Sequence, residues 1–208
     1  MSGAPSSPPT AVVFDVGNLL YGWDPGSFLA RQLPEDEARL RFIEDVDLWA
    51  WHETLDGGRP FDEAAAELSE KFPDYAALIS AWGERFGETI SDPVPGVHAI
   101  VEALDERGVP LFAITNFSAE FWAPFRARED TFFSRFRDIV VSGEEKLLKP
   151  DPAIYYRALD RFGLKPAEAL FIDDRKINVE GAEAVGMRGH LFTDAADLRR
   201  RLKAEGLL

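Results

Sequence analysis

Five short apolar segments recur along this chain, and none shows the alternation of polar and apolar residues that marks a half-exposed strand. Val, Ile, Leu and Phe dominate these segments, which is typical of strands buried on both faces of a parallel sheet. The segments are Ala11–Asp15, Pro110–Thr115, Asp138–Ser142, Ala169–Asp173 and Gly189–Thr193. We therefore expect an α/β fold built on a mostly parallel sheet of five or more strands.

Helical segments separate these strands, and turn-forming residues mark their ends. Asp151 is a candidate N-cap, Pro152 fits the first helical position, and Gly163 follows the apolar stripe of the same helix. Gly108 and Gly186 follow two further apolar stripes in the same way. Strands that alternate with helices imply βαβ units with right-handed crossovers.

The stretch from residue 21 to residue 92 lacks strand signals. Apolar residues at helical spacing indicate three helices there. The first follows Pro34, the second follows Phe61 and the third begins near Tyr75. This pattern predicts a helical insertion after the first strand of the α/β domain. The expected parts of the chain are a flexible Ser/Pro/Gly-rich tail at 1–10, an α/β core at 11–20 and 93–208, and a helical insertion at 21–92.

Composition excludes several classes of protein. The formal net charge is −14, whereas a protein that binds nucleic acid or an anionic membrane surface normally presents a basic face. The absence of cysteine excludes a disulfide framework, a thiolate zinc site and a cysteine nucleophile. No apolar run approaches the ~20 residues that span a bilayer, and the N-terminal residues do not resemble a signal peptide. We expect a cytoplasmic protein.

Four short motifs place polar residues at the ends of predicted strands or just before predicted helices. They are Phe14–Asn18, Ala113–Asn116, Lys149–Pro152 and Phe171–Asp174. Ligands of open α/β sheets bind outside the carboxyl ends of the strands, so we expect these polar side chains to meet at one edge of the sheet. A carboxylate nucleophile, a hydroxyl group, a lysine and two further carboxylates suit metal-assisted transfer of a phosphoryl group.

The three carboxylates of Asp15, Asp173 and Asp174 predict a cation at this edge. Two like charges at 4 Å cost ~1 kcal/mol in water and ~4 kcal/mol at an effective dielectric constant of 20. Oxygen ligands without a nearby histidine or cysteine favour Mg²⁺ over zinc. Because Mg²⁺ retains open positions for phosphate oxygens, the same cluster favours a phosphorylated substrate.

The order and spacing of the four motifs resemble those of the haloacid dehalogenase superfamily. The resemblance is to the Mg²⁺-dependent, phosphatase-like members with a helical cap after the first strand, and it covers nearly the whole chain from Ala11 onward. It implies a Rossmann-like core and a helical cap. It also implies hydrolysis of a small phosphorylated metabolite, with sugar phosphates as one candidate class, through an aspartyl-phosphate intermediate. No partner beyond the substrate and no particular oligomeric state is predicted.

The resemblance assigns roles to individual residues. Asp15 would attack phosphorus, Thr115 would donate a hydrogen bond to the phosphoryl group with Asn116 beside it, and Lys149 would neutralise that group. Mg²⁺ would be held by Asp15, Asp174 and the backbone carbonyl of Gly17, with Asp173 nearby through a metal-bound water. His52 is a candidate substrate contact in the cap, although packing inside the cap is the favoured interpretation of this residue.

Gly17 departs from the family pattern. Most phosphatases of the superfamily carry Asp at this position, where it acts as general acid and then as general base. Glycine can do neither, and such catalysis is typically worth ~10²–10⁴-fold. A substrate with a good leaving group, a residue of the cap or a water molecule could compensate for the loss.

Two other functions compete with the phosphatase. A 2-haloacid dehalogenase would use the same aspartate on carbon without a metal, but it would not need Asp173 and Asp174, and such enzymes usually carry Tyr in place of Gly17. A catalytically weak binding protein would explain Gly17, but it would not need a nucleophile, a lysine and a carboxylate cluster together. Fold alone decides between none of these.

Overall fold

A computed structural model describes residues 8–208, so the first seven residues of the expected tail lie outside the described part of the chain. Five parallel strands form one sheet in the order β5-β4-β1-β6-β7. The strands are β1 (Ala11–Phe14), β4 (Leu111–Thr115), β5 (Asp138–Val141), β6 (Ala169–Asp173) and β7 (Arg188–Leu191). The expected α/β fold with a parallel sheet is confirmed, and the ends of the predicted strands differ by at most two residues.

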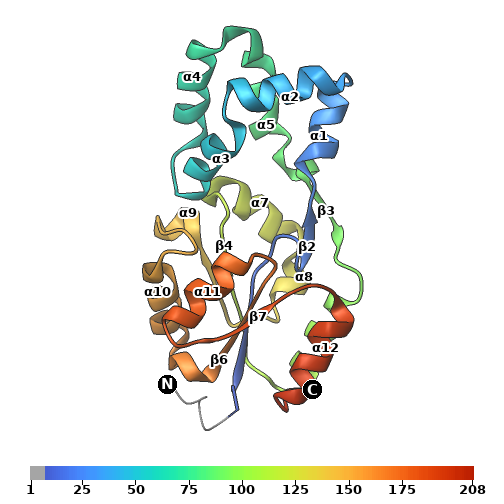
Figure 1. Ribbon diagram of the computed structural model, residues 1–208, viewed down its shortest axis with the longest axis vertical. Helices are drawn as coiled ribbons and strands as arrows, with labels where there is room; N and C mark the ends of the chain where they lie inside the picture. The colour runs from blue at the N-terminus through green and yellow to red at the C-terminus, as the bar shows by residue number, and fades with distance from the viewer. Residues whose placement is uncertain (1–7) are drawn as a thin grey trace.

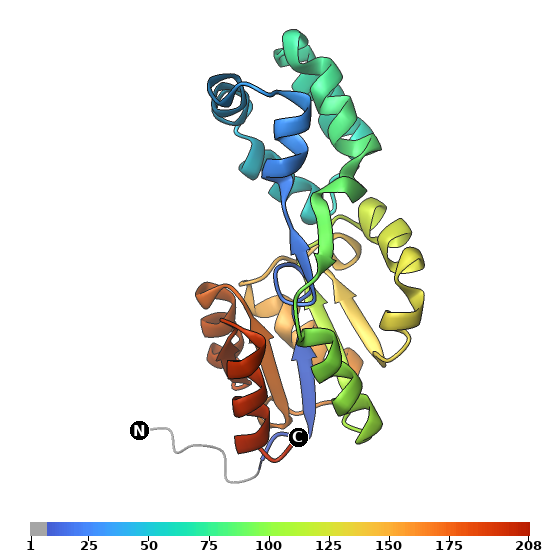
Figure 2. The same cartoon turned by 90° about the vertical axis from the view of Figure 1, so that its right-hand side faces the viewer.

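Helices cover both faces of this sheet (Figures 1 and 2). Successive residues of a strand point to opposite faces, so Val12 and Phe14 pack in one hydrophobic cluster and Ala11 and Val13 in another. The first cluster is completed by α6 (Val97–Glu106), α7 (Ala119–Arg128), α8 (Asp130–Phe133) and α12 (Ala195–Ala204). The second is completed by α10 (Pro152–Phe162) and α11 (Lys176–Ala184). Short turns at α9 (Ser142–Glu145) and η3 (Pro166–Glu168) link these elements.

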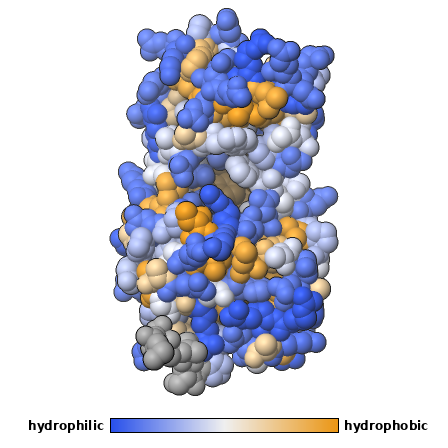
Figure 3. Space-filling model, in the orientation of Figure 1, coloured by the Kyte–Doolittle hydropathy of each residue, from blue (hydrophilic) through white to orange (hydrophobic). Residues whose placement is uncertain are grey.

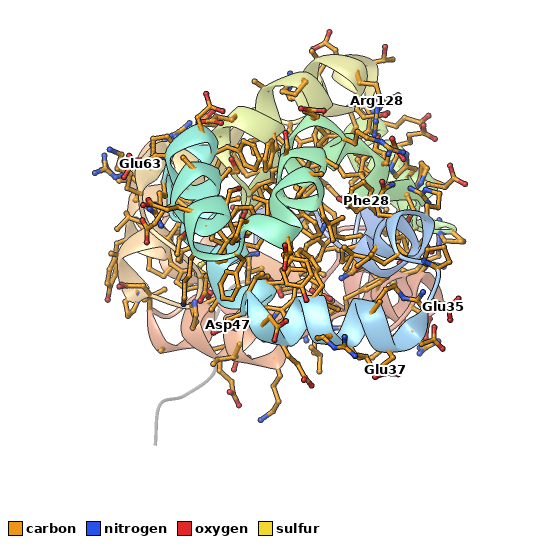
Figure 4. All side chains as sticks on the ribbon, turned by 90° about the horizontal axis from the view of Figure 1, so that it is seen from above. Phe28, Glu35, Glu37, Asp47, Glu63 and Arg128 are labelled. Carbon is orange, nitrogen blue, oxygen red and sulfur yellow. The ribbon has the colours of Figure 1, made fainter. Side chains whose placement is uncertain are left out.

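A second group of helices lies beyond the carboxyl edge of the sheet, and we call it the upper helical layer (Figure 1). Its helices are α1 (Pro25–Gln32), α2 (Asp36–Asp45), α3 (Leu48–Asp56), α4 (Phe61–Lys71), η1 (Pro73–Tyr75), α5 (Ala76–Glu84) and η2 (Phe86–Thr89). They enclose a third hydrophobic cluster that includes Phe28 and Trp82. Figure 4 shows Phe28 among the helices, with Glu35, Glu37 and Glu63 at the rim of the layer.

The three helices predicted for this region are too few. Asp24 caps an additional helix, α1, because its carboxylate accepts a hydrogen bond from the backbone N–H of Ser27 at 2.9 Å. The helix expected after Pro34 is divided into α2 and α3 at Asp47, which adopts a left-handed conformation (φ 46°). Neither the additional helix α1 nor the break at Asp47 produces a change in apolar spacing that the sequence alone would reveal.

The expected absence of strands from residues 21–92 is also wrong. β2 (Tyr21–Trp23) and β3 (Ile90–Pro93) form an antiparallel pair that joins the upper helical layer to the sheet (Figure 2). Both strands are too short to show a period-2 pattern. Gly22 also lacks the strand propensity of its neighbours, and a Cβ atom there would lie 2.2 Å from Ser91 Oγ. None of the helices in residues 8–208 combines the length and apolarity needed to cross a membrane.

Candidate active site

Asp15, Lys149 and Asp173 meet at the carboxyl edge of the sheet. Asp15 directly follows β1, and Asp173 is the last residue of the neighbouring β6. Lys149 reaches them from the loop before α10, with its Nζ atom 2.8 Å from Asp15 Oδ1 and 2.7 Å from Asp173 Oδ2. All three side chains are buried. The parallel sheet therefore gathers an ion-paired triad from segments far apart in the sequence.

The charges of this triad are set by burial and by one another. Burial raises the pKa of Asp15, while the ammonium of Lys149 opposes the rise and favours the carboxylate. Burial favours the neutral amine of Lys149, but the carboxylates of Asp15 and Asp173 outweigh it and raise the pKa of the lysine. Lys149 is thus a charged group. The backbone N–H of Val16 also donates to Asp15 Oδ1 at 2.7 Å and fixes this carboxylate.

Both carboxylate oxygens of Asp173 are already engaged. Oδ1 accepts from the backbone N–H of Arg175 at 2.8 Å and from Asn178 Nδ2 at 3.0 Å, and Oδ2 accepts from Lys149. Asp174 is only partly buried, and burial and the charge of Asp173 raise its pKa. A hydrogen bond from the Asn18 side chain favours the carboxylate of Asp174. Asp173 therefore orients its neighbours, whereas Asp174 faces the cavity.

The residues at this edge fit a hard divalent cation. Asp15, Asp173 and Asp174 each offer a carboxylate oxygen within 4.8 Å of the others. An all-oxygen donor set suits Mg²⁺. Within residues 8–208, the buried Oδ1 atom of Asn178 has no hydrogen-bond partner although this residue lines the cavity, so its capacity to accept a hydrogen bond is unused. Gly17 also lines the cavity.

Thr115 and Asn116 end β4 and begin the following loop. Thr115 is buried and is not among the residues that line the cavity. Asn116 does line the cavity, but its amide is paired with the backbone of Lys149. Lys149 N donates to Asn116 Oδ1 at 2.8 Å, and Asn116 Nδ2 donates to the carbonyl of Lys149 at 3.1 Å. In this structure Asn116 holds the lysine loop in place.

A cavity of about 480 Å³ separates the carboxyl edge of the sheet from the upper helical layer. Figure 3 shows a hollow between these two parts of the molecule. Polar groups of the sheet side line one wall: Asp15, Asn116, Lys149 and Asp174. The opposite wall is largely aromatic and contains Trp23, Trp49, His52, Asp56 and Phe86. The cavity can therefore hold a charged group at one end and an apolar or ring-shaped body at the other.

His52 belongs both to the cavity wall and to the packing of the upper helical layer. Its ring stacks between Trp23 and Phe86, with centroid distances of 5.5 Å to each. Only 5% of its surface is exposed, and burial lowers its pKa to about 4. His52 is therefore neutral at pH 7 and brings no positive charge to the cavity.

This buried histidine predicts an acid-sensitive stability. Because the pKa of His52 is about 4 when folded and about 6.5 when unfolded, protons bind the unfolded chain preferentially between these values. Above pH 6.5 the folded protein keeps the full stabilisation that comes from a neutral His52. As the pH falls from 6.5 to 4, the free energy of unfolding decreases by roughly 3 kcal/mol. Urea unfolding of the wild type and of His52→Phe, repeated between pH 4 and pH 6.5, measures this loss of stability. Parallel curves for the two proteins would show that His52 does not titrate in this way.

Asp56 supplies a further carboxyl group at the cavity, and it belongs to none of the four sequence motifs. Asp56 ends α3 and faces the cavity, and the exposed fraction of its side chain is 16%. Burial raises its pKa to about 7, with Glu53 and Asp15 acting in the same direction. His52 Nε2 lies 3.7 Å from Asp56 Oδ1. The spacing of four residues between these two at a helix end was the only signal in the sequence.

Comparison with known proteins agrees with this geometry. A sequence model of the haloacid dehalogenase-like hydrolases matches residues 9–186, so the chain belongs to this family of hydrolases. Among curated proteins, it is 24% identical to sesquiterpene phosphatase astK of Aspergillus oryzae over 89% of this chain and 90% of that protein. It is also 24% identical to the phosphorylated carbohydrates phosphatase of Thermotoga maritima, over 85% of this chain and 82% of that protein.

Solved structures share the fold. A predicted hydrolase of the same family from Porphyromonas gingivalis superposes with a TM-score of 0.71 at 20% identity, and the match covers 95% of this chain and 99% of that chain. An enzyme of the family from Bacteroides thetaiotaomicron, solved with magnesium and inorganic phosphate, has a TM-score of 0.64 at 18% identity and covers 89% of this chain and 95% of that chain. At these identities the likeness concerns the Rossmann-like architecture.

Proposed function

We propose that this chain is a Mg²⁺-dependent phosphatase that hydrolyses a small phosphorylated metabolite, with sugar phosphates as one candidate class. The observation that carries the proposal is the buried ion pair of Asp15 and Lys149 at the polar end of a cavity with an aromatic wall. Relatives named as phosphatases along most of their length support the same reaction. In this proposal, residues 21–92 form a cap over a core of residues 11–20 and 93–208. A cytoplasmic location stays a prediction.

Each residue of the triad would have a separate task. Asp15 would attack phosphorus and become an aspartyl phosphate, which water then hydrolyses. Lys149 would hold the nucleophile in position and offset charge on the transferred group, while Asp173 keeps the ammonium aimed at Asp15. Thr115 and Asn116 stay candidates for contacts with the phosphoryl oxygens.

A cation is needed because Lys149 offsets only one of the three carboxylates, so an incoming phosphate would be repelled. Asp15, Asp174 and the Gly17 carbonyl would hold Mg²⁺, with Asp173 outside them. When bound, this ion would neutralise phosphoryl charge and orient the group for in-line attack.

A 2-haloacid dehalogenase is not favoured. The L-2-haloacid dehalogenase of Xanthobacter autotrophicus superposes with a TM-score of 0.63 at 16% identity, over 96% of this chain and 84% of that chain, so it shows the shared fold alone. A reaction without a metal would use Asp15 but would not need the further carboxylates of Asp173 and Asp174 beside it. A binding protein without activity would have no need to bury an ion-paired nucleophile.

Release of inorganic phosphate from a panel of phosphate monoesters tests the proposal. The panel should include aryl, sugar, prenyl and simple alkyl phosphates, each assayed in Mg²⁺ and in EDTA, beside a panel of 2-haloacids assayed for halide. We expect Mg²⁺-dependent phosphate release and no halide. Activity that persists in EDTA, or halide release, would contradict the proposed function.

Removal of Asp174 is expected to weaken Mg²⁺ binding by at least about tenfold, since even residues one layer outside a metal site typically contribute 10–100-fold to affinity. Calorimetry of wild type and Asp174→Ala measures the change. Asp160→Ala is the matched control, because Asp160 is exposed on α10. Unchanged affinity in Asp174→Ala would exclude Asp174 as a ligand.

A further inference from the structure

Among the described residues, the carboxyl groups on the side of the cavity that holds the nucleophile are Asp15 itself and Asp174 of the cation cluster. Gly17 carries no side chain, and a Cβ atom built there would meet nothing within 4 Å. If Asp15 displaces an alcohol from phosphorus, the departing oxygen still needs a proton. The structure must therefore supply this proton from another part of the cavity wall.

Most titratable groups of the described cavity wall are committed elsewhere. Lys149 is held between two carboxylates, and Asp174 belongs to the cation cluster. The hydroxyl of Tyr21 donates to Glu129 at 3.0 Å, and burial raises its pKa. His52 is neutral, because burial lowers its pKa to about 4. Glu53 and Arg175 also line the cavity but are exposed, which leaves Asp56, the second carboxyl group of α3 at the cavity, as the candidate.

We propose that Asp56 is the general acid and general base of the reaction, and that it takes over the role that the family usually gives to an aspartate at position 17. This proposal rests on the proposed phosphatase function. Asp56 faces the same cavity as Asp15 and Lys149, from the opposite wall. Its carbonyl accepts a hydrogen bond from Ser142 Oγ at 2.6 Å, and the backbone N–H of Ser118 donates to its carboxylate. Two contacts from the sheet side thus fix this end of α3.

The surroundings of Asp56 suit both halves of a proton relay. Burial, together with the carboxylates of Glu53 and Asp15, raises its pKa to about 7, while Ser118 and Lys149 act in the opposite direction. The neutral ring of His52 also lies beside it. A group with a pKa close to the working pH is available in both protonation states, which is the condition for acting as acid and then as base.

The chemistry balances in two steps. Asp15 Oδ forms a bond to phosphorus, the bond from phosphorus to the ester oxygen breaks, and that oxygen takes the proton of Asp56 and leaves as an alcohol. The Asp56 carboxylate then takes a proton from water while the water oxygen bonds to phosphorus. The bond between phosphorus and Asp15 breaks, which restores the Asp15 carboxylate, protonated Asp56 and inorganic phosphate.

Asp56→Asn tests the proposal, because the amide keeps the shape of the side chain and removes its proton transfer. We expect turnover of alkyl phosphates to fall by about 10²–10⁴-fold, and turnover of p-nitrophenyl phosphate, whose leaving group needs little protonation, to fall far less. The alkaline limb of the wild-type pH profile for alkyl phosphates, near pH 7, should disappear. Asp62→Asn, at an exposed position of α4, is the matched control. Equal losses for both classes of ester, or no loss, would overturn the proposal.

A second variant separates proton transfer from folding. Gly17→Asp has open space for its side chain, so adding it to Asp56→Asn should restore alkyl phosphate turnover at least about tenfold. Failure of this rescue in a folded double variant would contradict the assignment. If Asp56→Asn does not fold, the wild-type profile decides, since a rate for alkyl phosphates that stays level above pH 7 excludes Asp56. A wild type inactive on every ester would instead refute the phosphatase function itself.

Discussion

Replacing Asp15 by Asn is expected to lower kcat/KM for every accepted phosphate ester by on the order of 10⁴-fold or more. The amide is a poor nucleophile, although it has the shape of the carboxylate. Val16 N–H can still donate to the remaining oxygen, and Lys149 keeps its contact with Asp173. The loss should therefore appear in the chemical step, with little change in the fold.

Single-turnover release of phosphate, with circular dichroism to confirm folding, measures this effect. Asp160→Asn removes an exposed carboxylate on α10 and should behave as the wild type. Residual activity within tenfold of the wild type would mean that water attacks phosphorus directly. Asp15 would then be only a cation ligand.

Replacing Lys149 by Met is expected to lower the free energy of unfolding by about 3–5 kcal/mol in the absence of Mg²⁺. The buried ammonium lies within 2.8 Å of two carboxylates, and its removal leaves Asp15 and Asp173 buried without a counterion. The pKa of Asp15 should rise further, because the cation that opposes the effect of burial is gone. Activity should fall as well, since a protonated Asp15 cannot attack phosphorus.

Urea unfolding in EDTA measures the stability change, with Lys203→Met as the control, because Lys203 is exposed on α12. Added Mg²⁺ should recover part of the lost stability by binding near the same carboxylates. A change below about 1 kcal/mol in EDTA, the size typical of an exposed ion pair, would show that this triad contributes no more than a surface salt bridge.

The parallel sheet was predictable because its central strands are buried on both faces. Runs such as Ala169–Asp173 have no polar alternation, and each is bounded by residues that end helices or begin turns. The short strand at Tyr21–Trp23 and the break at Asp47 depend on local conformations that leave no periodic signal. Those details come from tertiary packing, which overrides propensity.

The carboxylates of the site were predictable for a geometric reason. Parallel strands end at the same edge, so Asp15 and Asp173 had to converge once the strands were identified. The pairing of the Asn116 amide with the backbone of Lys149 joins residues 33 positions apart, and it could not be foreseen from either motif alone. Asp56 could not be foreseen either, because its place depends on how α3 docks against Ser142.

The contact between Ser142 and Asp56 links the protonation of the Asp56 carboxyl group to the docking of α3. Lifting α3 from the sheet side would break this contact and expose the carboxyl group to water. Without burial, its pKa would return toward the ordinary value of an aspartate, and the group would release its proton. Docking of α3 thus favours the protonated form of Asp56, and undocking favours the carboxylate. An open molecule would hold the nucleophile without the proposed proton donor, so esters whose leaving group needs a proton would react only after the substrate is enclosed.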